Sequence, residues 1–208
     1  MDEETLLLIA NILSLIGNAI ATSAAFLKSK RNILLFQSSN HVLEIVAQFL
    51  TKAYSGMVQE VISLIRNVTF VFVKTDKKAP KLIVSIVCLV AGLAMGVWFN
   101  IVFSGNVLYG YLPVAGAAIY AVFVIFAFML VSDERNGELM MKIGLIFNAI
   151  CWSTYGVFIR LWPVVIFNAV AFVLAVISIV RISIGKRKAR EALPAEKQED
   201  ANDPAISE

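Results

Sequence analysis

The strongest chemical signal in the sequence is a stripe of polar residues within an apolar stretch. The stripe consists of Gln37, His41, Glu44, Gln48 and Thr51, at steps of four, three, four and three residues. This spacing places all five residues on one face of an α-helix over four turns. A charged side chain at membrane depth costs ~2.5–3.5 kcal/mol to insert, so the stripe is expected to face a partner or a water-filled cavity.

Glu44 and Arg66 form a candidate pair across the turn that follows the stripe. If this turn is centred near Tyr54, the two residues differ in depth by only ~3 Å at ~1.5 Å per residue. We therefore predict that Glu44 and Arg66 are partners near the middle of the membrane. The pair could fix helix packing alone, or it could form a proton relay with His41. His41 could equally be no more than a hydrogen-bonded member of the stripe.

A weak internal repeat relates two pairs of residues at an offset of 101. It matches Tyr54 with Tyr155 and Asn67 with Asn168. The two amides would suit a neutral polar ligand, because an amide both donates and accepts hydrogen bonds, although each could instead bond a neighbouring helix. The two tyrosines could act as gates or as interfacial anchors.

A second candidate ligand face precedes Tyr155. Asn148, Trp152 and Tyr155 share one helical face, and the Trp152 ring could stack on a flat or apolar part of a ligand. We predict that substrate contacts come from Asn67, Asn148, Trp152 and Asn168, together with Gln48 and Thr51. Gating or coupling is predicted for Tyr54, Tyr155, Glu44, Arg66 and His41.

The overall composition identifies an integral membrane protein. Of 208 residues, 59% are hydrophobic and 16% charged, with a mean hydropathy of +0.80. Soluble domains have ~45–50% apolar and ~25% charged residues, so a soluble enzyme is excluded. The basic residues lie beside apolar runs rather than over a folded face, which argues against nucleic-acid binding. We predict no enzyme activity, cofactor or metal site, because no ATP-binding, metal-ligand or nucleophile-and-base motif occurs.

Seven segments have the length and apolarity of membrane spans. Fourteen Lys and Arg residues flank them on one side and only Lys52 and Arg160 on the other, which places the N-terminus outside and the C-terminus in the cytoplasm. The predicted fold is an all-α membrane protein in which two three-helix repeats, 5–73 and 113–184, are joined by a linker helix at 82–103. A disordered cytoplasmic tail is predicted over 185–208. The predicted spans are 5–27, 33–52, 57–73, 82–103, 113–132, 143–159 and 162–184.

The motifs carry two family resemblances. Trp152-x-x-Tyr155-Gly156 followed by Pro163 and Asn168 resembles the SWEET and SemiSWEET sugar transporters, and the predicted layout also resembles the PnuC vitamin transporters. The first repeat departs from the SWEET pattern at Thr51 and Ile62, so this resemblance implies a fold rather than a sugar substrate. A second resemblance covers most of the chain. Segments 28–31, 34–37, 53–56 and 66–67 are similar to the YgjV family of bacterial inner-membrane proteins, which implies no specific activity.

These observations favour a transporter for a small polar solute, in which the two three-helix units rock against each other. The alternative is a membrane scaffold or sensor without flux, whose polar stripe is filled by its own hydrogen bonds. The expected partners are the lipid bilayer and the solute, and a homo-oligomer is compatible with the sequence.

Overall fold

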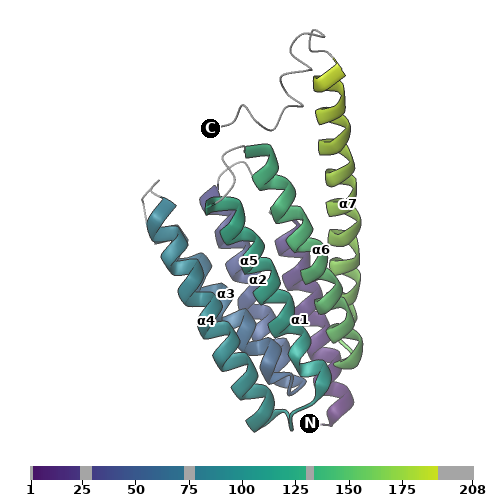
Figure 1. Ribbon diagram of the computed structural model, residues 1–208. Coiled ribbons are helices and arrows are strands. Elements are labelled where there is room, and N and C mark those ends of the chain that lie inside the picture. Colours follow the sequence, from purple (N-terminus) through teal and green to yellow (C-terminus); the bar gives the residue numbers. More distant parts are fainter. Residues whose placement is uncertain (1, 24–29, 73–77, 130–133, 192–208) are drawn as a thin grey trace.

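Seven α-helices follow one another along the part of the chain that the structure describes (Figure 1). The computed structural model describes residues 2–23, 30–72, 78–129 and 134–191. A short 3-10 helix, η2 (Leu108–Tyr111), precedes α5. The all-α prediction is confirmed, and each predicted segment corresponds to one helix. The helices are α1 (Glu3–Ser23), α2 (Lys30–Leu50), α3 (Tyr54–Phe72), α4 (Lys78–Phe103), α5 (Leu112–Met129), α6 (Glu134–Phe158) and α7 (Trp162–Glu191).

α6 and α7 extend furthest beyond the segments predicted for them. α6 begins at Glu134 instead of position 143, and α7 continues to Glu191 instead of ending at 184. Both extensions are rich in Glu, Lys, Arg, Leu, Met and Ala, which are good helix formers outside an apolar environment as well. The predicted disordered tail therefore begins too early, and its remaining part, 192–208, lies outside the described residues.

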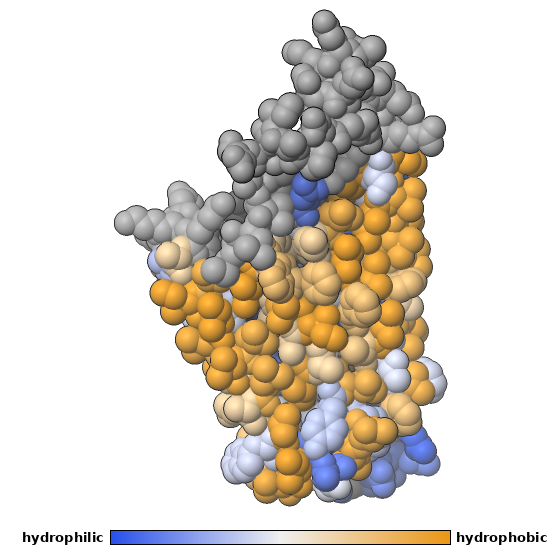
Figure 2. All heavy atoms as spheres, viewed as in Figure 1, coloured by the Kyte–Doolittle hydropathy of each residue, from blue (hydrophilic) through white to orange (hydrophobic). Residues whose placement is uncertain are grey.

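Apolar side chains cover the outside of the bundle. Four segments are long and apolar enough to cross a membrane: α1, residues 82–103 of α4, residues 108–127 and residues 162–184 of α7. Figure 2 shows a broad hydrophobic surface over the middle of the helices. Large apolar side chains such as Phe49, Trp98 and Val173 are more than half exposed. A surface of this kind suits contact with lipid.

The seven described helices pack in a closed ring. Each helix packs against the next one along the chain, and α7 returns to pack against α1. α3 also contacts α5, and Figure 1 shows α4 and α7 at opposite edges of the bundle. One end of the bundle carries the connections at 51–53, 104–111 and 159–161, and we refer to it as the turn end.

The α2–α3 and α6–α7 connections have the same structure. Each places a basic residue, Lys52 or Arg160, in the left-handed region with φ of 56°. In the first connection the Ala53 N–H donates to the Gln48 carbonyl over 2.8 Å, and the equivalent bond in the second connection measures 3.0 Å. This is the Schellman arrangement, in which a left-handed residue ends the helix. The two turns therefore correspond at an offset of 108 residues.

The predicted offset of 101 residues is wrong for these helices. Tyr54 is the first residue of α3, whereas Tyr155 lies in the last turn of α6, so the two tyrosines are not equivalent. The identical residue types at these positions do not reflect structural equivalence. The register is set by the α2–α3 and α6–α7 turns, whose side chains have only a positive charge in common. Lys52 and Arg160 carry that charge, and they also share the left-handed backbone.

Close helix crossings also recur in the two halves. A Cβ added at Gly17 of α1 would lie 2.7 Å from Asn40 Oδ1, and one added at Gly116 of α5 would lie 3.3 Å from Asn148 Oδ1. Positions 40 and 148 are themselves 108 residues apart. A Cβ at Gly116 would also lie 2.8 Å from Cys151 Cβ, closer than real Cβ atoms approach, whereas a Cβ at Gly17 would require the end of the Asn40 side chain to move.

Gly92 and Gly96 of α4 have the GxxxG spacing that is typical of close helix packing, and both lie at contacts with neighbouring helices. Gln59 of α3 donates from Nε2 to the Gly92 carbonyl over 2.8 Å. A Cβ at Gly96 would lie 2.6 Å from Val114 Cγ2 of α5. α4 is therefore held against α3 and α5 by contacts that depend on small residues.

We predict that Gly96→Val destabilises the protein, since overpacking a close contact typically costs ~1–3 kcal/mol. Thermal unfolding in detergent should show a lower melting temperature than the wild type. Ala94→Val, on the exposed side of the same helix, is the matched control and should leave the melting temperature almost unchanged. Equal melting temperatures for the two variants would contradict this packing.

Candidate functional site

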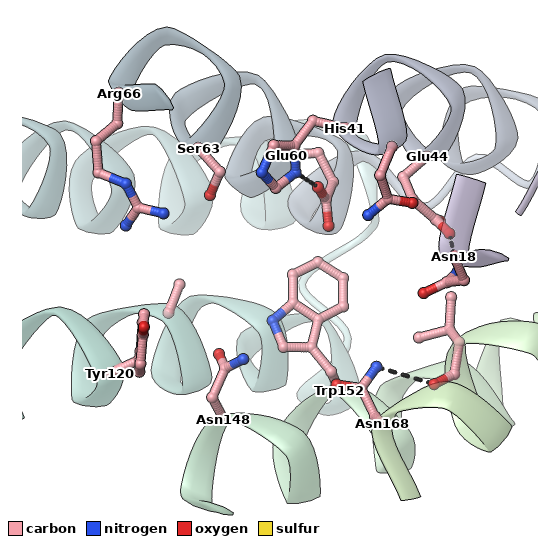
Figure 3. A pocket seen from close by; sticks show the side chains of 13 residues that line it. Asn18, His41, Glu44, Glu60, Ser63, Arg66, Tyr120, Asn148, Trp152 and Asn168 are labelled. Carbon is pink, nitrogen blue, oxygen red and sulfur yellow. Dashed lines mark hydrogen bonds and ion pairs between the residues drawn. The ribbon is translucent and has the colours of Figure 1, made fainter. Parts of the chain in front are cut away.

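A polar cavity of about 210 Å³ lies among six of the helices. α1, α2 and α3 supply one wall, and α5, α6 and α7 supply the other (Figure 3). Among the described residues, none of those that line the cavity comes from α4. The first wall contains Asn18, Asn40, His41, Glu44, Glu60, Ser63 and Arg66. The second wall contains Ala117, Tyr120, Asn148, Trp152, Val164 and Asn168.

Equivalent positions of the two halves face each other across the cavity. At the offset of 108 residues, Asn40 corresponds to Asn148, and both line the cavity. The same offset relates Glu44 to Trp152 and Glu60 to Asn168, which are lining residues too. The two walls thus use the same helix positions for different chemistry, with charges on the first wall and neutral groups on the second.

His41 is held between two residues of α3. Its Nδ1 lies 2.5 Å from Glu60 Oε2, and its Nε2 lies 3.2 Å from Asn67 Nδ2. If the Asn67 amide donates to Nε2, then Nδ1 carries the proton that points at the Glu60 carboxylate. His41 is thus paired with Glu60, a residue not in the predicted relay. Asn67 stands behind His41 and does not line the cavity.

Glu44 is bound by two residues of α1 rather than by Arg66. The carboxylate is 3% exposed, and its Oε1 accepts hydrogen bonds of 2.6 Å from Ser14 Oγ and from Asn18 Nδ2. Its Oε2 has no hydrogen-bond partner among the described residues. Glu44 and Arg66 line the same cavity but form no ion pair in the described part of the chain, so the predicted pair is wrong.

The error comes from the position of the turn. The turn is centred on Lys52 rather than on Tyr54, which already belongs to α3. Measured from Lys52, Glu44 is eight residues away and Arg66 is fourteen, which is a difference of ~9 Å in depth at ~1.5 Å per residue. Glu60 is eight residues from Lys52 and so lies level with Glu44.

The second wall carries neutral groups around an indole. Figure 3 shows the Trp152 ring projecting towards His41 and Glu60, with Asn148 and Tyr120 beside it. Asn168 lines the cavity and donates from Nδ2 to the Val164 carbonyl over 2.9 Å. Asn148, Trp152 and Asn168, three of the predicted substrate contacts, therefore all line the cavity, and their contact with a substrate stays a prediction.

A packed aromatic layer closes the cavity towards the turn end. Trp152 and Tyr155 meet edge to face with ring centroids 5.9 Å apart, and Tyr155 is 1% exposed. Tyr155 OH lies 3.5 Å from Ser55 Oγ, and a Cβ at Gly56 would lie 2.7 Å from its ring. We call Gln48, Ser55, Gly56, Trp152 and Tyr155 the plug.

A second hollow lies on the other side of the plug. It has a volume of about 240 Å³ and is lined by residues of the 51–55 and 103–110 segments together with Tyr155 and Ile159. We call this second hollow the vestibule. Trp152 lines the central cavity, whereas Tyr155 lines the vestibule. The two residues are three positions apart, so only about one helical turn of packed side chains separates the hollows.

The remaining predicted site residues lie outside the cavity. Gln48 is fully buried in the plug, and neither its amide nitrogen nor its amide oxygen has a partner among the described residues. Thr51 lines the vestibule and donates to the Ala47 carbonyl of its own helix. Tyr54 packs against Phe49 and Phe103 at the bundle surface, so it does not meet Tyr155.

Several lining residues were not predicted from the sequence, above all Glu60. A signal for it exists, since Glu60, Ser63 and Asn67 follow one another at steps of three and four residues on one face of α3. Tyr120 is a single polar residue between apolar neighbours and gives no such pattern, whereas Asn40 stands in a polar run and has the helical spacing of the stripe, three residues after Gln37 and four before Glu44. Among the described residues, no group of three His, Cys, Asp or Glu is placed to hold a metal ion.

We predict that His41 and Glu60 are energetically coupled. In a double-mutant cycle with His41→Gln and Glu60→Gln, unfolding free energies in detergent should be non-additive by ~1–3 kcal/mol, because each single change leaves the other group buried without its partner. The control cycle combines His41→Gln with Arg181→Gln, which lies on the exposed surface of α7, and should be additive. Additive effects in both cycles would contradict the pair.

Comparison with known proteins identifies the family of the chain. No curated protein and no solved structure matches it. A family model for bacterial inner membrane proteins, Imp-YgjV, matches residues 8–186, a range that includes every cavity-lining residue named above. This family assignment agrees with the apolar surface and with the four helices that can span a membrane. The chain is therefore a multi-pass protein of the bacterial inner membrane and belongs to the Imp-YgjV family.

Proposed function

We propose that this protein transports a small polar solute across the inner membrane by alternating access. The observation that carries the proposal is the polar cavity, which is lined by equivalent positions of α1–α3 and α5–α7. A pathway between two duplicated units is a common design of membrane transporters, and their binding sites lie near the middle of the bilayer. The solute itself would be held by Asn148, Trp152 and Asn168 together with the charged first wall.

The arrangement of the helices supports two three-helix units joined by α4. The α2–α3 and α6–α7 turns are alike, and the crossings at Gly17 and Gly116 are alike. None of the described residues of α4 lines the cavity, which suits a linker. We propose that all seven helices cross the bilayer, because α2, α3 and α6 direct their polar groups inward and their apolar groups outward. The distribution of Lys and Arg would place the turn end outside the cell.

The plug supports alternation between two accessible states. In this conformation Tyr155 is packed against Ser55 and Gly56, which closes the cavity towards the turn end. The plug is one turn thick and contains Gln48 with an unsatisfied amide, which costs ~1–3 kcal/mol when it is kept from water. Separation of the two units at the turn end would hydrate Gln48 and join the cavity to the vestibule.

The alternative is a scaffold or sensor without flux. Two features favour it: His41 is satisfied by Glu60 and Asn67, and Glu44 is bound by Ser14 and Asn18. All of these contacts lie within α1–α3 and require no solute. The cavity itself would then be a fixed, water-filled space.

Counterflow into proteoliposomes distinguishes the two functions. Vesicles preloaded with members of a panel of small neutral and zwitterionic solutes should accumulate the labelled form of the transported one. Asn148→Ala combined with Asn168→Ala should weaken its apparent affinity roughly ten- to thirtyfold, since two hydrogen bonds of ~1 kcal/mol each are lost.

The matched control combines Ser39→Ala with Thr154→Ala. Both hydroxyls are exposed and donate only to carbonyls of their own helices, so flux should be unchanged. If no solute enters above the level of protein-free vesicles while the protein remains folded, the scaffold function is favoured and the transporter is rejected.

A further inference from the structure

The first wall of the cavity contains four titratable or charged side chains, and two of them already form a pair. These are His41 and Glu44 on α2, and Glu60 and Arg66 on α3. His41 Nδ1 and Glu60 Oε2 are 2.5 Å apart, so they neutralise or hydrogen-bond each other directly. The described residues of the opposite wall contribute no ionised group, since Tyr120, Asn148, Trp152 and Asn168 are neutral side chains.

Glu44 and Arg66 are left without partners of opposite charge. Glu44 Oε2 is buried and has no hydrogen bond, and Arg66 makes no hydrogen bond or ion pair with any described residue. Both side chains line the same cavity. An unpaired ionic group in a membrane protein is costly, so both groups are suited to accept a charged ligand.

The two groups cannot satisfy each other because they lie at different depths. Their positions along α2 and α3 differ by ~9 Å in depth. Figure 3 shows the Arg66 guanidinium and the Glu44 carboxylate at opposite ends of this wall, with Ser63, Glu60 and His41 between them. A ligand that lies along the wall can contact both.

The other wall suits the middle of such a ligand. The Trp152 ring projects towards the section between the two charged ends, and an indole face accepts an apolar chain. A volume of about 210 Å³ equals that of roughly seven water molecules at about 30 Å³ each. The cavity is therefore large enough for a solute of a few bonds in length and too small for an oligosaccharide.

We propose that the cavity binds a small extended zwitterion, with its carboxylate on Arg66, its ammonium group on Glu44 and its linking chain along Trp152. The inference rests on the proposed function, in which the cavity is the solute-binding site. It concerns binding alone, so it can be tested without measuring flux. A ligand with one charge would leave either Glu44 or Arg66 unpaired and would bind more weakly.

Binding can be followed through Trp152 itself. The chain has three tryptophans, and Trp98 and Trp162 are each more than half exposed. Trp98→Phe with Trp162→Phe leaves Trp152 as the only indole. Its fluorescence in detergent or nanodiscs is titrated with glycine, 4-aminobutanoate and 6-aminohexanoate. Hexanoate and hexylamine serve as single-charge controls of matched length.

We expect 4-aminobutanoate or 6-aminohexanoate to bind at least about tenfold more tightly than hexanoate or hexylamine, which corresponds to ~1.4 kcal/mol. Glycine should bind more weakly, because its two charged groups are too close together to reach both residues. If the single-charge compounds bind as tightly as the longer zwitterions, if glycine does so, or if no zwitterion binds, the inference is overturned.

Substitution of each charge should change the preference in a specific direction. In Arg66→Gln, hexylamine should bind as well as 6-aminohexanoate, and in Glu44→Gln, hexanoate should do so. Arg181→Gln, on the exposed surface of α7, should keep the wild-type preference. If both cavity variants keep the preference for zwitterions, the assignment of these two residues is wrong.

Counterflow of the same zwitterions separates this inference from the proposed function. Binding without flux would support the ligand class and reject transport. Flux of another solute without binding of any zwitterion would support transport and overturn the ligand class.

Discussion

An ionised side chain among apolar helices needs either an opposite charge or water, and this requirement determines which way the helices of this protein face. Glu44 is 3% exposed and Glu60 is 9% exposed, yet the surface around them is covered by apolar side chains. Both carboxylates are directed into the centre of the bundle, where Ser14, Asn18 and His41 bind them. The cavity lies where Glu44 and Arg66 have no partner of opposite charge among the described residues.

The two halves share their construction and differ in their chemistry. The Schellman turns at Lys52 and Arg160 fix the register of α2 with α3 and of α6 with α7, so equivalent positions arrive at the cavity. At those positions the first half places carboxylates and the second half places an indole and an amide. Under the proposed function, a ligand therefore lies between a charged wall and a neutral wall.

The sequence was sufficient for the helices and for the inward face of α2. Apolar length predicts each helix, and the spacing of His41 and Glu44 places them on one side, because helical periodicity is a local property. It was not sufficient for contacts between helices. The turn is centred two residues earlier than expected, so the position on α3 that lies level with Glu44 moves by four residues, or ~6 Å. This shift is enough to place Glu60, rather than a position near Arg66, at the depth of Glu44.

The repeat shows the same limit. Similar letters at Tyr54 and Tyr155 suggested an equivalence, but backbone conformation rather than residue identity sets the register of the two halves. Lys52 and Arg160 both have φ of 56°, in the left-handed region, although neither is glycine. No sequence pattern predicts this left-handed conformation for a basic residue. The missed Glu60 could have been found from its spacing to Ser63 and Asn67, whereas Tyr120 could not.

The central claim is that the polar side chains surround water between the two halves, and local hydration tests it most directly. Spin labels are attached in separate variants at Asn148, which lines the cavity, and at its neighbour Phe147, which is exposed on the apolar surface, after Cys88 and Cys151 have been replaced by alanine. Electron spin-echo modulation by deuterium is then measured in D2O in a lipid bilayer. The account predicts strong deuterium modulation at position 148 and almost none at 147. Equally weak modulation at both positions would mean that the interior is dry and would contradict the account.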